Sequence, residues 1–432
     1  MVTSPKPIRE EAELATGPCK VALVGFGTVG RSVARILTSR NSQDLRLTHV
    51  FNRNVDRKRA DWVQNGVQWT QDFDDVLNSD VDVVVELVGG LEPAGEWVGH
   101  SLKSGKSVVT ANKQLIARRG PELLQLARAN GLHLLYGASV AGGIPVLLGL
   151  QEGLGGDRIH RISGILNGTC NYILSQIENA HISFAEALEQ AQAKGFAEAN
   201  ASEDIDGYDA RAKLTILART ALNAGLEPEQ VATRSIREVE EIDFAYAHDL
   251  GCTIRQISRA EVKDKTLFAG VQPALVPQAS ALARVTGSQN VVVSAGEFGG
   301  ETVFSGHGAG GDPTAVAVVS DLLWLSRNRH SRVAAEAKPT SDLSISGDFK
   351  TAHYVRFKVA DKPGILAALA NVFSRHEINV DAVLQQAGHS KAALPFVITL
   401  EPCRVEKLHQ ALAEIRKLEF HVAPPVDMPI LT

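Results

Sequence analysis

The segment KVALVGFGTVGRSVARIL, residues 20–37, decides the fold of the first part of this 432-residue chain. Its opening run is short, apolar and β-branched, which predicts a buried strand, and its last residues have helical spacing. Between them lie Gly25, Gly27 and Gly30 in a GxGxxG pattern. Such a pattern between a strand and a helix indicates nucleotide binding, since the glycines allow a tight turn, a close pyrophosphate and close helix packing. A purely structural strand-turn-helix is the alternative.

Further strands follow at the spacing of an α/β sheet. They are LRLTHVF ending at Phe51, VDVVVELVGG (81–90), KSVVTANKQLI (106–116) and HLLYGAS (133–139). Unbroken apolar runs of this kind are typical of parallel strands buried on both faces. We therefore predict an α/β fold, with a Rossmann-type doubly wound domain over residues 19–140. Ligands lie beyond the carboxyl ends of such strands, which is where Lys113 falls.

The end of the second strand favours one nicotinamide cofactor over the other. An NAD site usually places an Asp or Glu there to hold the ribose 2′-hydroxyl. This chain instead has Asn52-Arg53-Asn54, followed by Arg57, Lys58 and Arg59. A cationic strand end suits a 2′-phosphate, so the sequence favours NADP, with NAD possible. A solvated basic loop is the alternative interpretation.

The remaining chain divides into two further domains. Residues 141–311 mix strands and helices in an α+β pattern, and a helix over 312–328 is predicted to return to the first domain. A small, polar and charged stretch, 329–349, reads as a linker. Residues 350–432 follow a β-α-β-β-α-β order, which is ferredoxin-like. Residues 1–18 are polar, punctuated by proline, and predicted to be a disordered tail.

Composition excludes several classes of protein. A formal net charge of −5 gives no indication of a nucleic-acid or membrane-surface partner. No apolar run approaches the roughly 20 residues needed to span a bilayer, and the start has no apolar signal core. The four cysteines, Cys19, Cys170, Cys252 and Cys403, are scattered without a CxxC pair. These features predict a cytoplasmic enzyme.

Residues 195–219, GFAEANASEDIDGYDARAKLTILAR, concentrate groups with possible chemistry. Glu198, Asp204, Asp209 and Lys213 fall close together before an apolar helical run. On a helix starting near Tyr208, Asp209 and Lys213 share one face. A solvated i,i+4 ion pair is the ordinary interpretation of that spacing. A reactive lysine held by carboxylates is the other.

Six segments in order carry a resemblance that covers the chain from about Lys20 onward. They are TANK (110–113), ASVAGGIP (138–145), GILNGT (164–169), GFAEA (195–199), DIDGYDARAKL (204–214) and GHGAGGDPTA (306–315). With them the sequence resembles homoserine dehydrogenases that carry a C-terminal ACT regulatory domain. The resemblance implies NAD(P)-dependent interconversion of L-aspartate 4-semialdehyde and L-homoserine. In cells this reaction runs toward homoserine, for threonine, methionine and isoleucine biosynthesis.

The resemblance also implies residue roles. Glu198 and Asp209 would bind the substrate's amino end, with Asp204 contributing nearby or orienting its neighbours. Lys213 would give the proton to the developing alkoxide, and Lys113 would contact substrate or nicotinamide and share that relay. The implied cofactor contacts are Phe26, Gly27, Thr28 and Val29 at the turn, Arg53 at the 2′-phosphate, Lys113, Gly195 and Glu198 near the nicotinamide, and Gly310 closing over the cofactor.

Two positions depart from the family pattern. Many members have a glutamate where this chain has Gly137, and that glutamate helps hold a monovalent cation. The carbonyls of Val140, Gly142 and Ile144 remain as a candidate Na⁺ or K⁺ site, with a weak or absent site as the alternative. The second departure is Asn200-Ala201, where the family usually has Asp-Pro. It removes a charge and a rigid φ angle beside Glu198.

The last domain resembles an ACT domain through residues 361–366 (DKPGIL) and 378–380 (INV). The resemblance implies L-threonine as a feedback effector, contacting residues near Gly364 and Asn379. A domain that serves only dimerisation is the alternative. A homodimer through the middle domain's sheet is expected, and paired ACT domains could build a homotetramer.

Two other functions compete with this one. The first is a different NADP-linked reductase of an amino-acid semialdehyde. A phosphorylating semialdehyde dehydrogenase would need a cysteine nucleophile at a strand end, and Cys170 has no evident base beside it. The second is a catalytically inactive amino-acid sensor, which the presence of Lys113, Glu198, Asp209 and Lys213 argues against.

Overall fold

The computed structural model describes residues 17–40, 44–329, 331 and 342–431. Most of the predicted tail and much of the predicted linker lie outside these residues. The chain divides into two compact units, each of which is described by itself. The first unit runs to Leu115 and adds Arg119–Ala138 and the segment from Thr314. The second takes Ile116–Arg118, Ser139–Pro313 and the C-terminal part.

The first unit contains a six-stranded sheet in which every neighbouring pair is parallel. Its strand order, β3-β2-β1-β4-β5-β6, is that of a Rossmann fold, which confirms the predicted fold class. The strands are β1 (Cys19–Val24), β2 (Leu45–Phe51), β3 (Gln68–Thr70), β4 (Val83–Glu86), β5 (Ser107–Thr110) and β6 (Leu134–Leu135).

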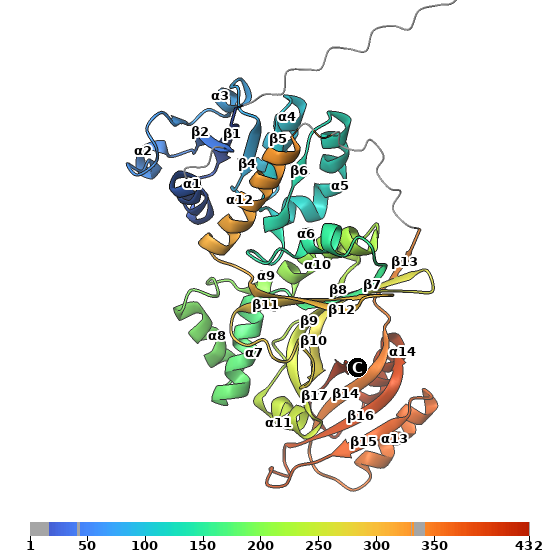
Figure 1. The fold of residues 1–432 in the computed structure, drawn as a ribbon. Coiled ribbons are helices and arrows are strands. Elements are labelled where there is room, and N and C mark those ends of the chain that lie inside the picture. Colours follow the sequence, from blue (N-terminus) through green and yellow to red (C-terminus); the bar gives the residue numbers. More distant parts are fainter. Residues whose placement is uncertain (1–16, 41–43, 330, 332–341, 432) are drawn as a thin grey trace, which may run out of the picture. The chain divides into compact units, whose positions relative to one another are not determined.

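Helices connect these strands, and a later helix completes the unit (Figure 1). They are α1 (Thr28–Arg40), α2 (Val55–Lys58), α3 (Phe73–Leu77), α4 (Ala94–Lys103), α5 (Lys113–Ala129) and α12 (Gly311–Asn328). Val318 and Leu322 of α12 are buried in the same cluster as Val21 and Leu23 of β1. The predicted return helix therefore supplies part of the Rossmann core.

The second unit is built on a mixed sheet whose path runs β12-β11-β7-β9-β10-β17-β14-β16-β15, with β8 and β13 paired to β10. Its first strands are β7 (Ile159–Ile165), β8 (Ala232–Thr233), β9 (Cys252–Lys263), β10 (Thr266–Pro277), β11 (Gln289–Gly296), β12 (Gly300–His307) and β13 (Ser344–Ser346). Segment η1 (Gly137–Ser139) begins in the first unit and ends in the second. The other helical segments of the second unit are α6 (Val146–Leu148), η2 (Gly149–Gly153), α7 (Gly168–Ala180), α8 (Phe184–Ala193), α9 (Ser202–Ile205), α10 (Tyr208–Leu222), η3 (Pro228–Gln230) and α11 (Glu241–Asp249).

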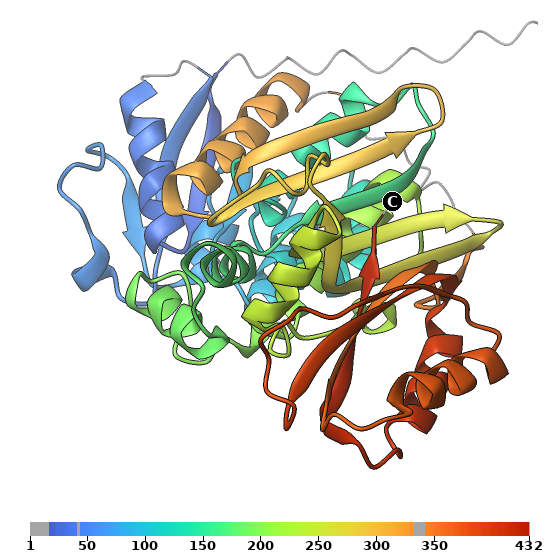
Figure 2. The ribbon, with the colours of Figure 1, turned by 90° about the horizontal axis from the view of Figure 1, so that it is seen from below.

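The C-terminal part of this sheet has the predicted ferredoxin-like order. Its elements are β14 (Lys350–Val359), α13 (Ile365–Arg375), β15 (Val380–Leu384), β16 (Leu394–Arg404), α14 (Val405–Ile415) and β17 (His421–Ile430). Numbered within the domain, the strands lie in the order 4-1-3-2. Figure 2 shows α13 and α14 together on one face of these strands.

This C-terminal domain is not separate from the rest of the unit. Leu275 of β10 pairs with Ile430 of β17, which makes the two sheets continuous. Tyr354 and Met428 are buried in one apolar cluster with residues of α7 and α11. Ion pairs with buried aspartates cross the same boundary, Arg356 to Asp243 at 2.8 Å and Arg234 to Asp427 at 2.7 Å. Removing the domain would expose the core of the unit.

Several segments differ from the sequence predictions, and the short strands β3 and β8 are among those that were not predicted. Strand β9 was not predicted, because buried polar side chains such as Arg255 and Gln256 hide its character. The strand predicted at 133–139 is wrong beyond Leu135, since Gly137–Ser139 form a 3₁₀ turn. The predicted linker contains β13, which pairs with β10. None of the described helices is long and apolar enough to cross a membrane.

Candidate active site

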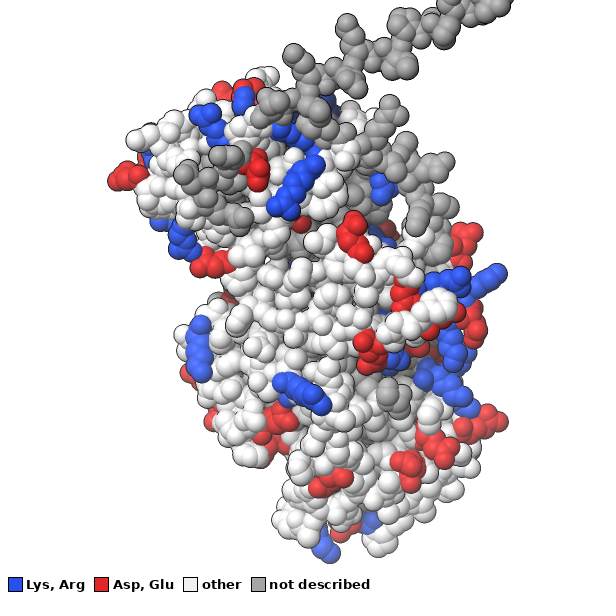
Figure 3. Space-filling view, viewed as in Figure 1, with Lys and Arg blue, Asp and Glu red and all other residues white. Residues whose placement is uncertain are grey.

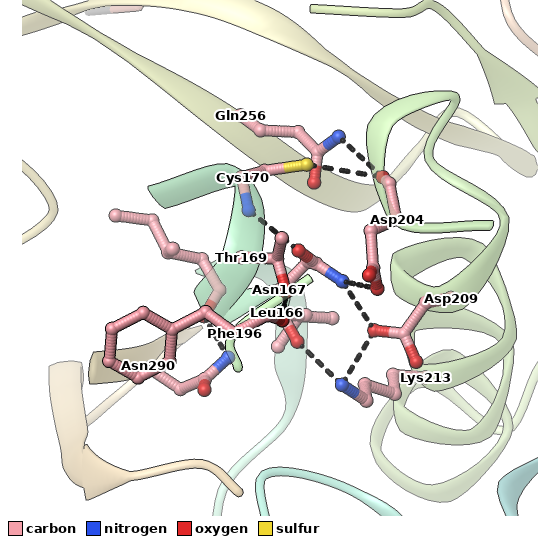
Figure 4. A network of polar contacts seen from close by, with 11 residues as sticks. Leu166, Asn167, Thr169, Cys170, Phe196, Asp204, Asp209, Lys213, Gln256 and Asn290 are labelled. Carbon is pink, nitrogen blue, oxygen red and sulfur yellow. Dashed lines mark hydrogen bonds and ion pairs between the residues drawn. The ribbon is translucent and has the colours of Figure 1, made fainter. Parts of the chain in front are cut away.

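A buried lysine–carboxylate pair lies at the start of α10 (Figure 4). Gly207, with φ of +85°, precedes the helix, so Asp209 falls in its first turn and Lys213 one turn later. Lys213 Nζ donates to Asp209 Oδ2 at 2.7 Å and to the Leu166 carbonyl at 2.8 Å. The two side chains are 12% and 6% exposed. The ordinary interpretation, a solvated surface pair, is therefore wrong for these two residues.

Asn167 joins this pair to a second acid, Asp204. Its Oδ1 caps α7 by accepting from the Cys170 amide at 2.8 Å. Its Nδ2 donates to Asp204 Oδ1 at 2.6 Å and to Asp209 Oδ2 at 2.9 Å. Asn167 was not among the predicted site residues. Its second function was missed because no helical or strand spacing connects it to Asp204.

The Cys170 thiol has a structural environment. Its Sγ donates to the Asp204 carbonyl at 3.1 Å. Complete burial, with the charges of Asp204 and Asp209 nearby, raises the pKa of this thiol well above its ordinary value. A thiolate nucleophile at this position is thus disfavoured, in agreement with the argument against a phosphorylating semialdehyde dehydrogenase.

The structure does not bring the Glu198 side chain into this cluster. Glu198 is exposed in the loop after α8, and its carbonyl accepts from Gln192 Nε2 at 3.2 Å. Gly195, with φ of +74°, is exposed at the start of the same loop. The departure at Asn200-Ala201 is compensated locally, because Asn200 Oδ1 accepts from the Ser202 amide and Ala201 is buried.

In the first unit, the glycine turn is tight at Gly25 and Gly30 and open at Gly27. Gly25 has a φ of +106°, and a Cβ on Gly30 would lie 2.2 Å from the Gly25 carbonyl oxygen. By contrast, nothing lies within 4 Å of the Cβ position of Gly27, which leaves room for a ligand. Thr28 is exposed at the first position of α1, and Val29 is partly buried beside it. The Phe26 side chain is fully buried against Trp69, so only its backbone could reach a cofactor.

The basic residues of this unit lie at strand ends and along α1. Arg53 is exposed directly after β2, and Lys113 opens α5 directly after β5, where Asn112 caps the helix. A cavity of about 600 Å³ opens beside α1. It is lined by Thr28, Arg31, Ser32, Arg35, Thr38, Ser39 and Trp62. Arg31 and Arg35, four residues apart on α1, line this cavity but were not among the predicted site residues.

Gly137 contacts a carboxylate from another element. Asp321 of α12 accepts from the Gly137 amide at 2.8 Å, and a Cβ at position 137 would lie 2.7 Å from Asp321 Oδ1. A side chain at 137 is therefore excluded while Asp321 stays in place. Among the candidate cation ligands, the Ile144 carbonyl accepts from the Val146 amide at 2.7 Å. A site at Val140, Gly142 and Ile144 stays a prediction. The described residues contain no cluster of three His, Cys, Asp or Glu side chains that could hold a metal.

We expect Asp321→Asn to stabilise the first unit at about pH 8 and to have no effect near pH 4. Burial raises the pKa of Asp321 from 3.8 to about 7. The unfolded chain releases this proton first, so stability falls as pH rises between these values. Asparagine keeps the acceptor for Gly137 and never ionises. All four tryptophans (62, 69, 97 and 324) lie in this unit, so fluorescence melts report it directly.

The expected gain is several degrees in Tm at the higher pH. Asp61→Asn, an exposed acid in the same unit, serves as the control and should change neither melt. An equal gain for Asp321→Asn at both pH values would contradict the assigned titration.

A Rossmann sheet with an open glycine turn, in a chain that also holds a lysine against the carboxylate of Asp209, indicates a nicotinamide-dependent oxidoreductase. Family models agree with this class. The model for homoserine dehydrogenase matches residues 145–323, the model for its NAD-binding domain residues 25–137, and the ACT domain model residues 353–420. The chain belongs to the homoserine dehydrogenase family and is an NAD(P)-dependent enzyme.

Individual relatives show how far the likeness extends. Homoserine dehydrogenase of Mycobacterium tuberculosis is 40% identical over 385 residues, which are 85% of this chain and 87% of that protein. The crystal structure of homoserine dehydrogenase from Thiobacillus denitrificans is 34% identical with a TM-score of 0.89, and the match covers 96% and 98% of the two chains. A hyperthermophilic archaeal homoserine dehydrogenase in complex with NADPH is 26% identical with a TM-score of 0.62, over 73% of this chain and 99% of the other.

Proposed function

We propose that this chain reduces L-aspartate 4-semialdehyde to L-homoserine with NADPH, using Lys213 as the proton donor. The observation that carries the proposal is the burial of Lys213 against Asp209 and the Leu166 carbonyl. When bound, the reduced nicotinamide supplies a hydride to the aldehyde carbon. Lys213 holds a proton at Nζ for the aldehyde oxygen, which becomes the homoserine hydroxyl. Lys113 shares this relay.

The acids of the cluster would bind the other end of the substrate. Asp204 and Asp209 lie within hydrogen-bonding distance of one Asn167 amide group, so the amide fixes the spacing of two negative charges. An α-ammonium group requires such charges. Glu198, exposed on its loop, would join them when the substrate is bound, and Gly195 and Gly310 would contact the cofactor.

The activity is tested by following NADP⁺ reduction with L-homoserine, with L-serine as the control substrate. We expect turnover with L-homoserine alone. Serine lacks the extra carbon that places the hydroxyl of homoserine beyond the amino end. A chain that oxidises neither amino acid would contradict the proposed reaction.

We expect Arg53→Ala to raise KM for NADPH by about tenfold or more while leaving KM for NADH nearly unchanged. Arg53 is exposed at the end of β2, followed by Arg57, Lys58 and Arg59, and no acid takes the position that would hold a 2′-hydroxyl. Only NADPH carries the phosphate that the guanidinium would bind. Steady-state kinetics with both cofactors measure the effect. A lower KM for NADH than for NADPH in the unchanged protein would contradict the assigned preference.

We further propose that L-threonine inhibits the enzyme through the ACT domain. Gly364 precedes α13 with a φ of +93° and open space around its Cβ position, whereas Asn379 follows the helix. The 11-residue helix is about 16 Å long, so one copy holds the two residues at opposite ends. A site that uses both would combine them from two copies.

Asn379→Ala should raise the threonine concentration for half-inhibition about tenfold at unchanged kcat. The side chain is exposed and donates to Glu401 Oε2 at 3.0 Å, so its loss costs little stability. Point variants are needed here, because removing the domain would expose the core. Asn371→Ala, an exposed asparagine on α13, is the control. Equal inhibition of both variants would rule out Asn379 as an effector contact.

The assembly that we propose is a homodimer through the second unit's sheet, extended to a homotetramer by paired ACT domains. The sheet path ends in β12 on one side and β15 on the other. Val303 of β12 and Val383 of β15 are 46% and 48% exposed, as expected for edges that another copy covers. A monomer at all concentrations in analytical ultracentrifugation would contradict this assembly.

A further inference from the structure

A groove in the second unit lies between strands β9 and β10 on one side and the start of β14 and the end of β17 on the other. Strands β10 and β17 meet at Leu275 and Ile430 and then separate, and the segment from β13 to β14 bridges the gap. The groove has a volume of about 410 Å³, which is within the range of small-molecule sites. Neither Gly364 nor Asn379 lines it, so it is distinct from the proposed threonine site.

One side of the groove is apolar and aromatic. Phe268 of β10 and Phe349 lie with ring centroids 5.6 Å apart, and Ile257 and Leu431 add aliphatic surface. The Cβ position of Gly270 is 3.4 Å from the Phe349 ring, so this ring lies directly on β10. A ligand would place its apolar part against these rings.

The other side carries charge of both signs. Arg259 lies over the Phe349 ring at 5.8 Å and donates to Glu261 at 2.6 Å, while its buried Nε has no hydrogen-bond partner among the described residues. Lys350 and Asp348 also line the groove. In Figure 3, side chains of both signs mingle along the right-hand edge of the molecule, at the level of the β9–β10 hairpin. A mixed lining suits a zwitterion better than a simple anion.

The strand beneath the groove also connects to the substrate cluster. Gly270 and Val271 pair with Ala232 and Thr233 of β8, and the next residue, Arg234, donates its amide proton to the Val271 carbonyl at 2.8 Å. Two residues further on, the Ile236 amide donates to the Ile205 carbonyl at 3.2 Å, directly after Asp204.

We propose that this groove binds an apolar α-amino acid as an effector. The ligand's carboxylate pairs with Arg259, its ammonium with Glu261, and its side chain packs on Phe268 and Phe349. Binding reaches the substrate loop through β10 and β8. The inference stands apart from the proposed catalytic roles, because binding is measured without turnover.

The test uses the full chain and three probes that share one isobutyl group. L-Leucine carries both charges, 4-methylpentanoate lacks the ammonium, and 3-methylbutylamine lacks the carboxylate. By calorimetry we expect saturable binding of L-leucine, with both analogues at least about tenfold weaker. L-Leucine should also change KM for L-homoserine by at least about twofold. Absence of saturable binding, equal binding of the amine, or binding without a change in KM would each overturn the proposal.

Variants locate the binding within the unit. Arg259→Gln should weaken L-leucine binding at least about tenfold. Arg158→Gln, an arginine whose side chain is 80% exposed and which lies outside the groove, should not. Gly270→Ala narrows the groove with an ordinary contact to Phe349, so it should weaken binding in a folded protein. Asn379→Ala should leave L-leucine binding unchanged. Loss of binding in Asn379→Ala but not in Arg259→Gln would place the ligand in the ACT effector site and overturn the inference.

Discussion

Replacing Lys213 by methionine is expected to lower kcat by about 10²–10⁴, the usual contribution of a general acid. Methionine fills a similar volume, but it cannot give a proton to the developing alkoxide. It also removes the 2.7 Å ion pair with Asp209, whose carboxylate keeps its hydrogen bond from Asn167. Stopped-flow and steady-state measurements with L-homoserine and NADP⁺ would show the loss in kcat. Lys213→Met removes both the proton donor and the positive charge beside Asp209. A second variant is therefore needed to separate these two effects.

Lys213→Arg serves that purpose, because arginine keeps the charge but releases a proton far less readily. Compared with Lys213→Met, we expect Lys213→Arg to bring KM closer to the value of the unchanged enzyme, while kcat stays low. Lys417→Met, on the surface after α14, controls for the loss of a lysine. If Lys213→Met kept kcat within about tenfold of the unchanged enzyme, another group would have to supply the proton.

The second large effect is expected from Gly30→Ala. The added Cβ would lie 2.2 Å from the Gly25 carbonyl oxygen, so β1 and α1 must move apart at the glycine turn. Overpacking of this kind costs about 1–3 kcal/mol, and displacement of the turn should weaken NADPH binding at least about tenfold. Tryptophan fluorescence melts and NADPH titration would record the two losses.

Two other glycines of the same unit separate fold from function. Gly27→Ala places its Cβ in open space where the pyrophosphate would approach, so NADPH affinity should fall at unchanged Tm. Gly99→Ala lies within α4 with nothing nearby, and alanine favours helices there. It should leave affinity unchanged. A normal Tm and normal NADPH affinity in Gly30→Ala would show that the turn tolerates a side chain.

Local sequence was sufficient for most of the architecture of the first unit, apart from the three-residue strand β3. The GxGxxG turn lies between a strand and a helix. Short unbroken apolar runs such as VVV in β4 (Val83–Glu86) are typical of a parallel strand that is buried on both faces. The same holds for the ferredoxin-like order of the last domain. Strand β9 escaped prediction because its burial depends on partners that local spacing does not show. Arg255, for example, is 2% exposed and pairs with Glu178, which is 77 residues away.

The site was predicted where its residues share a helix and incompletely elsewhere. Asp209 and Lys213 are four apart, so one turn of α10 brings them together. Asn167 reaches Asp204 and Asp209 only through tertiary packing, across 37 and 42 residues. Asp321 fills the space beside Gly137 from 184 residues away. Contacts of this length depend on the whole fold, and residue types or spacing cannot specify them.

The pairing of Leu275 with Ile430 and the shared core around Tyr354 affect how the second unit unfolds locally. Elements that share a core and a continuous hydrogen-bond ladder tend to exchange their amide hydrogens as one cooperative foldon. Strands β10 and β17 should therefore show the same protection from deuterium, although about 150 residues separate them in the sequence. The last domain of this chain therefore cannot be removed without exposing apolar side chains of α7 and α11. A relative without this domain would need polar substitutions on those two helices.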